Sequence, residues 1–264
     1  MPSARSIELL ELARRIVDAL PHDVVSEAAV TGSVSRGVAD ELSDIEMLLV
    51  TPEELSLEEC FELAKAAGLE QLNTWGPQNV PTRRVFGYLH GVPIELIWWS
   101  RSHAEAAFKG SGDAIVHAIS LRTVGDVKRW QADLATVPVE TICEEAAMPW
   151  GGFAPEGILT IARPSETFSR LEWTVDGAHR VLRIVYAVNG LWPPTAKRLA
   201  ARSADLLVKP ERLAERIDDA LMEREPRRAL RVLAELQLDA VRLAPDGPNV
   251  VRARDWLTRA LDLL

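Results

Sequence analysis

Two carboxylates stand one residue apart at the start of an apolar run early in the chain. Asp44 and Glu46 lead directly into Met47–Val50, so residues 44–51 are expected to form a strand. Successive side chains of a strand point to opposite faces, which would place Asp44 and Glu46 on one face. Neighbouring carboxylates repel, and burying them is costly unless a cation neutralises them. These hard oxygen ligands suit Mg²⁺, which takes one or two carboxylates and completes its shell with water and substrate phosphates.

A Gly-Ser pair precedes these carboxylates and could bind phosphate. Gly32 would let the backbone approach an anion closely, and amides at the start of the following turn could point at it. Ser33 adds a hydroxyl, and Arg36 adds a guanidinium suited to phosphate oxygens. The alternative for residues 30–50 is an exposed loop with an acidic edge strand. That alternative would not explain two acids at the start of so apolar a strand.

A third carboxylate, Glu95, interrupts another apolar run, Ile94–Trp99. The preceding residues predict a hairpin that turns at His90-Gly91, with Glu95 in its second strand. Carboxylates rarely go unpaired inside apolar strands, so Glu95 needs a reason to be there. It either serves chemistry or faces solvent from an edge strand.

The combination of Gly32-Ser33, ten residues, Asp44-x-Glu46 and an apolar strand resembles the signature of the DNA polymerase β-like nucleotidyltransferase superfamily. The string Ser-Asp-Ile-Glu-Met at 43–47 is similar to that of aminoglycoside nucleotidyltransferases. The resemblance implies ATP as co-substrate and two Mg²⁺ ions on Asp44 and Glu46. It also implies a third carboxylate on a neighbouring strand, a position that Glu95 matches, as metal ligand or as acceptor of the attacking hydroxyl's proton.

A second stretch, residues 172–205, resembles the helical domain of streptomycin/spectinomycin adenylyltransferases. On that resemblance Lys197 would reach the triphosphate, and Asp176, Glu172 and Trp173 would face the acceptor. Asp176 with Arg180 also repeats a spacing at which kanamycin-type enzymes hold a catalytic base, although an Asp is shorter than the Glu expected there. The alternatives are a solvated helix lysine and an ordinary i,i+4 salt bridge.

Composition limits the class of protein and of ligand. The net charge of −9 argues against a protein that holds nucleic acid and suits a cationic partner. The chain has only two cysteines, Cys60 and Cys143, without metal-ligand spacing, which favours reduced thiols in a cytoplasm. Its most apolar run, 93–99, is too short to span a membrane and contains a glutamate.

The elements that would position these residues change in character near residue 125. Before it, the expected helices are 6–20, 57–67, 102–109 and 112–121, and the expected strands are 24–31, 44–51, 69–74 and the hairpin 83–99. After a helix at 126–134 and a Pro/Gly-rich irregular connection, further helices are expected at 165–188, 194–205, 210–222, 226–244 and 250–264. We therefore expect an N-terminal nucleotidyltransferase α/β domain with a small mixed sheet, residues 1–125, and a C-terminal helical-bundle domain, residues 126–264.

These features together predict a cytoplasmic Mg²⁺-dependent nucleotidyltransferase that transfers AMP from ATP to a hydroxyl of a small, cationic molecule such as an aminoglycoside. Glu95 or Asp176 would be the general base. One alternative is an antitoxin-type enzyme that adenylylates a protein, although such chains are usually shorter. The other is a homologue that binds nucleotide or drug without turnover. The sequence does not predict an oligomeric state.

Overall fold

The computed structural model describes residues 1–74, 81–148, 154–193, 197 and 199–264. The chain divides into two compact units, Met1–Ala135 and Thr136–Leu264. The first contains a mixed six-stranded sheet with helices and the second is helical, which confirms the predicted fold class. No helix in the described ranges is long and apolar enough to cross a membrane.

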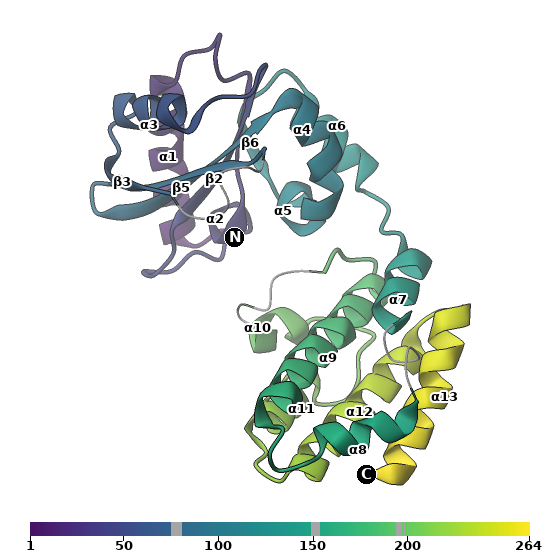
Figure 1. Ribbon diagram of the computed structural model, residues 1–264. Coiled ribbons are helices and arrows are strands. Elements are labelled where there is room, and N and C mark those ends of the chain that lie inside the picture. Colours follow the sequence, from purple (N-terminus) through teal and green to yellow (C-terminus); the bar gives the residue numbers. More distant parts are fainter. Residues whose placement is uncertain (75–80, 149–153, 194–196, 198) are drawn as a thin grey trace. The chain divides into compact units, whose positions relative to one another are not determined.

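The sheet of the first unit has the strand order β3-β4-β5-β2-β1-β6. Figure 1 labels β3, β5, β2 and β6 of this sheet. The two central strands, β2 and β5, run parallel, and all other neighbouring pairs are antiparallel. The predicted hairpin is confirmed, because β4 and β5 join at His90-Gly91, where Leu89 pairs with Val92. The strands are β1 (Glu27–Val30), β2 (Ile45–Thr51), β3 (Glu70–Asn73), β4 (Arg83–Leu89), β5 (Val92–Ser100) and β6 (Ile119–Arg122).

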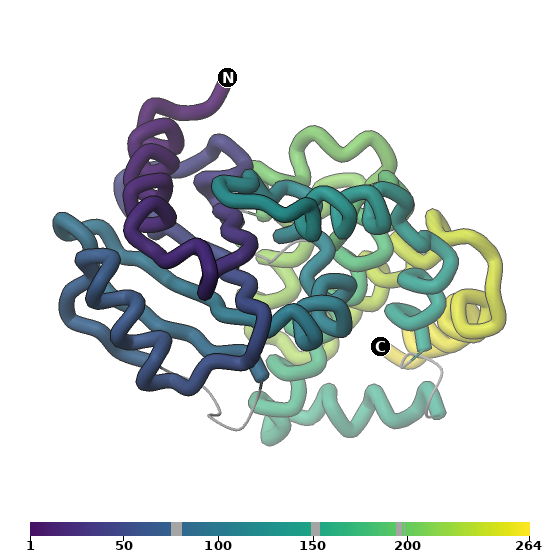
Figure 2. The backbone as a smooth tube through the Cα atoms, turned by 90° about the horizontal axis from the view of Figure 1, so that it is seen from above, coloured from purple at the N-terminus to yellow at the C-terminus, as the bar shows by residue number. Residues whose placement is uncertain are grey.

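One face of this sheet is apolar and covered by two helices, α1 (Ala4–Ala19) and α3 (Leu57–Ala66). Figure 2 shows them, in purple and blue, beside the strands. The Ser56 capping box that the sequence predicts at the start of α3 is present. The core of this face consists of alternate strand residues with α1 and α3 side chains, among them Leu9, Ile16, Met47, Leu49, Cys60, Val85, Leu96 and Trp98.

The other face is covered only in part. At the end of β5, Trp99 is buried and contacts His103 of α4 (Arg101–Ala107) ring to ring at 5.7 Å. The helix α6 (Asp126–Asp133) packs against β1, and α5 (Gly112–Val116) packs against α6. The side chains on this face at the opposite end of β2 and β5 include the predicted site carboxylates.

The predicted helix at 112–121 is wrong in its second half. The helix α5 ends at Val116, and Ile119–Arg122 form the edge strand β6, paired with β1. Every side chain of β6 is half-buried, so this segment has no clearly buried face, and helical periodicity was a poor predictor of its structure. Here pairing with an exposed strand edge overrides local preference, since β-propensity depends on tertiary context.

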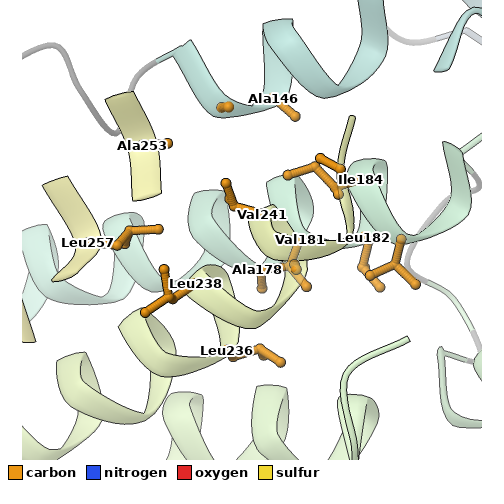
Figure 3. Packing of buried hydrophobic residues seen from close by; sticks show 14 of the residues in the cluster. Ala146, Ala178, Val181, Leu182, Ile184, Leu236, Leu238, Val241, Ala253 and Leu257 are labelled. Carbon is orange, nitrogen blue, oxygen red and sulfur yellow. The ribbon is translucent and has the colours of Figure 1, made fainter. Parts of the chain in front are cut away.

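The second unit is built from helices around one core, α9 and α12 at its centre. Figure 3 shows Ala178 and Val181 of α9 near Val241 and Leu238 of α12, in the same apolar core as Leu182 and Leu236. The predicted helices at 165–188, 210–222, 226–244 and 250–264 are observed, whereas part of 194–205 lies outside the described residues. The helices are α7 (Val139–Ala147), α8 (Ile158–Ile161), α9 (Thr167–Val188), α10 (Leu199–Ala204), α11 (Leu213–Met222), α12 (Pro226–Leu243) and α13 (Pro248–Leu263).

Two helices of this unit, α7 and α8, fall where an irregular connection was expected. The helix α7 begins after Pro138 and buries Ile142, Cys143 and Ala146 against the helical core. Proline is favoured at helix starts, because its missing N–H would have no intrahelical partner there. Pro138 in the sequence therefore indicated the start of α7.

Candidate active site

Glu46 and Glu95 lie next to each other on the two central strands. The register of the parallel pair β2–β5 sets Glu46 opposite Glu95, with Ile45 opposite Ile94 and Met47 opposite Leu96. Neighbouring strands are about 4.8 Å apart and paired residues point to the same side, so the two carboxylates share one face. The apolar residues on either side of them point to the opposite face, into the core. The site therefore sits on the face opposite to α1 and α3, while the apolar side chains anchor β2 and β5 from behind.

The Gly32 turn closes directly onto Glu46. Thr31, just after β1, donates its backbone N–H to the Glu46 carbonyl at 2.9 Å. Gly32 follows with φ +69° and starts the four-residue helix α2 (Gly32–Ser35). A Cβ built on Gly32 would lie 1.8 Å from Glu46 Oε2, so the carboxylate occupies the space that any other residue's side chain would fill. Glycine is thus required here for both its left-handed backbone and its missing Cβ.

Glu95 is buried between groups of opposite charge. Arg84 of β4 donates from Nη1 to Glu95 Oε1 at 2.8 Å. Burial is the largest influence on the Glu95 carboxyl and raises its pKa; Arg84 opposes this, and Glu46 and Asp44 raise the pKa further. A carboxylate with a raised pKa is better matched to accepting a proton near neutral pH than an ordinary Glu.

Asp44 and Ser33 flank the pair. Asp44 immediately precedes β2 and is half-buried, and its charge acts on Glu95. Within the described ranges, neither the Asp44 carboxylate nor the Ser33 hydroxyl has a hydrogen bond or ion pair. Both groups therefore have free oxygen atoms to offer a ligand.

The donor set fits Mg²⁺ in part. Among the described residues, no three His, Cys, Asp or Glu side chains are arranged to hold a metal ion. At this site one Glu95 oxygen is engaged by Arg84. Mg²⁺ needs only one or two protein carboxylates when phosphates and water complete its shell. Glu46 and Asp44 meet that requirement without Glu95.

Arg36, the predicted phosphate ligand, has a protein partner. Its Nη1 lies 3.3 Å from Asp113 Oδ2 of α5, and both side chains are largely buried. This ion pair ties the α2 turn to α5. A phosphate at this place would share Arg36 with Asp113.

Asp176 and Trp173, which the sequence places near the acceptor, have partners within the helical unit. Both oxygens of Asp176 accept from Arg180, at 2.6 Å and 3.1 Å, as the i,i+4 spacing predicts. Trp173 packs against the helical core and Trp256, whereas Glu172 is exposed. Lys197 is exposed. The roles of Asp176 and Lys197 toward a substrate stay predictions.

Sequence reasoning missed Arg84, although the sequence contained the signal. A hairpin with the two-residue turn His90-Gly91 pairs residues 86 and 95, so residue 84 falls on the same face as Glu95. Applying that register to the predicted hairpin would have identified Arg84 as a partner for Glu95.

Comparison with known proteins adds little to this geometry. No protein-family model and no curated protein matches the chain. Among solved structures, it is similar to a nucleotidyltransferase-like protein from Exiguobacterium sibiricum, with a TM-score of 0.41 and 11% sequence identity over 96% of this chain and 90% of that chain.

Proposed function

We propose that this chain is a Mg²⁺-dependent nucleotidyltransferase that transfers AMP from ATP to a hydroxyl of a small cationic molecule, such as an aminoglycoside-type antibiotic. The observation that supports this most is the pairing of Glu46 with Glu95 in register on parallel strands, with the Gly32 turn closed onto Glu46. This arrangement sets a cation ligand, Glu46, beside a candidate base, Glu95, and beside a glycine turn that phosphate can approach.

Each residue has a distinct role in this proposal. Asp44 and Glu46 hold Mg²⁺, which supplies neutralisation of the charge on the phosphates. The Gly32 backbone, the Ser33 hydroxyl and Arg36 bind the phosphate oxygens. Glu95, with its raised pKa, accepts the proton of the acceptor hydroxyl, and Arg84 keeps the Glu95 carboxylate in place. Asp176 is the weaker candidate for the base, because Arg180 engages both of its oxygens.

The test is turnover of labelled ATP with Mg²⁺ and a panel of aminoglycosides, scored by pyrophosphate release. Asp44→Asn should abolish release while the unfolding temperature holds or rises slightly, because the change removes like-charge repulsion near Glu46 and Glu95. The matched control is Glu41→Gln, which neutralises an exposed carboxylate three residues earlier and should keep full activity. Pyrophosphate release by Asp44→Asn at the normal rate would refute the metal assignment.

A further inference from the structure

The strand β4 presents an aromatic strip on the face that holds the carboxylates. Val85, Gly87 and Leu89 of β4 are buried toward the core, so the alternate residues Arg84, Phe86 and Tyr88 point to the other face. Phe86 is half-buried and Tyr88 is 44% exposed. We refer to Phe86 and Tyr88 as the β4 aromatic strip.

Carboxylates border this strip on both sides. Phe86 pairs with Glu95 of β5, and Tyr88 pairs with Glu70 of β3, which is exposed. Directly paired residues of antiparallel strands point to the same side with their Cβ atoms about 5 Å apart. The rings thus lie between Glu95, with Glu46 beyond it, and Glu70 at the sheet edge. Arg84 lies on the same face and pairs with Glu95.

The sheet order separates the strip from the phosphate turn. Because β5 lies between β4 and β2, and β1 follows on the far side of β2, the strip and the Gly32 turn flank the Glu46–Glu95 pair from opposite sides. In phosphoryl transfer the attacking and the leaving oxygens lie roughly in line on opposite sides of the phosphorus. If the leaving pyrophosphate lies at the Gly32 turn, the attacking hydroxyl arrives from the side of the strip.

We propose that the β4 aromatic strip binds the acceptor: Phe86 and Tyr88 contact the face of a ring that bears protonated amines, and Glu70 attracts those amines. This rests on the proposed nucleotidyl transfer, and it assigns the acceptor side of the site. Aromatic rings attract cations over their faces and bind apolar ring faces, and the surrounding carboxylates select positive charge. A nucleotide is excluded from the strip by the same charges, since its phosphates are anionic.

This placement serves the transfer of AMP from ATP to the acceptor hydroxyl. The acceptor oxygen forms a bond to the α-phosphorus of ATP, and the bond from that phosphorus to the β-phosphate oxygen breaks. Pyrophosphate takes the bonding electron pair and leaves toward the Gly32 turn. The hydroxyl proton passes to the Glu95 carboxylate, which is paired in register with Phe86 of the strip.

The sequence offers a direct probe, because it has only two tyrosines. Tyr88 is 44% exposed on the strip, whereas Tyr186 is 4% exposed in the helical unit. In protein labelled with 3-fluorotyrosine, ¹⁹F NMR should give one signal for each, assigned with Tyr88→Phe. We expect kanamycin, a polycationic aminoglycoside, to shift the Tyr88 signal and leave the Tyr186 signal in place. Maltose, a neutral ring compound, should shift neither.

Variants then measure what the strip contributes. Phe86→Ala and Tyr88→Ala should each weaken kanamycin binding, and raise its KM, by about three- to tenfold, as expected for lost ring and cation contacts. Tyr88→Phe keeps the ring and should bind nearly as well. The KM for ATP should stay unchanged. The matched control is Phe168→Ala, which removes a 78% exposed aromatic side chain from the first turn of α9 and should change neither constant.

Several outcomes would overturn the assignment. A Tyr88 signal that moves with Mg²⁺-ATP and not with kanamycin would place the nucleotide on the strip. An equal response to maltose would show ring contact without selection for charge, and no response would show that the strip is not a ligand surface. A Tyr88 shift without pyrophosphate release would keep the binding proposal and reject nucleotidyl transfer. Pyrophosphate release without a Tyr88 shift would do the reverse.

Discussion

Replacing Gly32 by alanine tests the central geometric feature of the site. The structure gives this position two separate demands: φ +69°, which favours glycine, and a Glu46 carboxylate oxygen 1.8 Å from where a Cβ would be. Alanine violates both. Gly91, at the β4–β5 turn, has φ +78° with no atom within 4 Å of its Cβ position, so Gly91→Ala violates only the first. The two glycines lie in the same compact unit, which makes them a matched pair.

The expected magnitudes follow from these two demands. A left-handed backbone costs an alanine about 1–2 kcal/mol, which sets the expected loss of unfolding free energy for Gly91→Ala. Forcing an extra atom into a filled space adds about 1–3 kcal/mol. Glu46 is half-buried and its carboxylate can swing aside, so the lower part of that range applies. We expect Gly32→Ala to lose roughly 1 kcal/mol more stability than Gly91→Ala.

Urea unfolding followed by tryptophan fluorescence measures both losses. Adding Glu46→Ala to Gly32→Ala should remove the extra loss of stability relative to Gly91→Ala, because the atom that clashes is then absent. The double variant should therefore differ from Glu46→Ala alone by the Gly91→Ala value. Gly32→Ala should also abolish nucleotide turnover by displacing the Glu46 carboxylate, whereas Gly91→Ala should not. Equal losses for Gly32→Ala and Gly91→Ala would show that the Glu46 carboxylate does not lie against Gly32.

Two further predictions concern the cores. Gly177→Ala should destabilise the helical unit by about 1 kcal/mol or more, despite the better helix propensity of alanine, because its Cβ would lie 2.2 Å from Nε2 of Gln237, which is 1% exposed. A double-mutant cycle with Gln237→Ala should recover part of that loss, and additive losses would contradict the contact. Burial raises the pKa of Cys60 to about 12 and that of Cys143 to about 11, so both thiols stay protonated at pH 8. Ellman's reagent should react with neither in the folded chain and with both in denaturant, and rapid reaction in the native state would refute their burial.

Local sequence signals were sufficient for the elements that hold the site. The apolar run around Glu95 and the His90-Gly91 turn predict the hairpin, and the turn length fixes which residues of β4 and β5 face each other. The Asp44-x-Glu46 spacing predicts a strand with both acids on one face, and β2 begins at Ile45, directly between them. These are short-range relations, so the sequence contains them directly.

The pairing of Glu46 with Glu95 could not be predicted in this way. The strands β2 and β5 are parallel, and more than forty residues separate the paired positions. No turn fixes the register of such a pair; it is set by packing of Ile45, Met47 and Ile94 against helices from elsewhere in the chain. A shift by one residue would move every one of these side chains to the opposite face. Tertiary packing thus decides that the two carboxylates meet, and the same holds for β6, where pairing with β1 overrode a helical pattern.

Glu95 is the position where stability and chemistry conflict most. Its carboxyl is buried beside Glu46 and near Asp44. Burial and the charges of Glu46 and Asp44 each raise the pKa of the Glu95 carboxyl, which means that they disfavour its charged form. Replacing a buried ion pair by apolar residues of similar size is often neutral or stabilising, so the Arg84–Glu95 pair is weak evidence for a structural role. A leucine at 95 would continue the apolar run of β5 without any desolvation penalty. A sequence that breaks its local pattern at one residue, beside Glu46 and within the influence of Asp44, is best explained by what that residue does to a substrate.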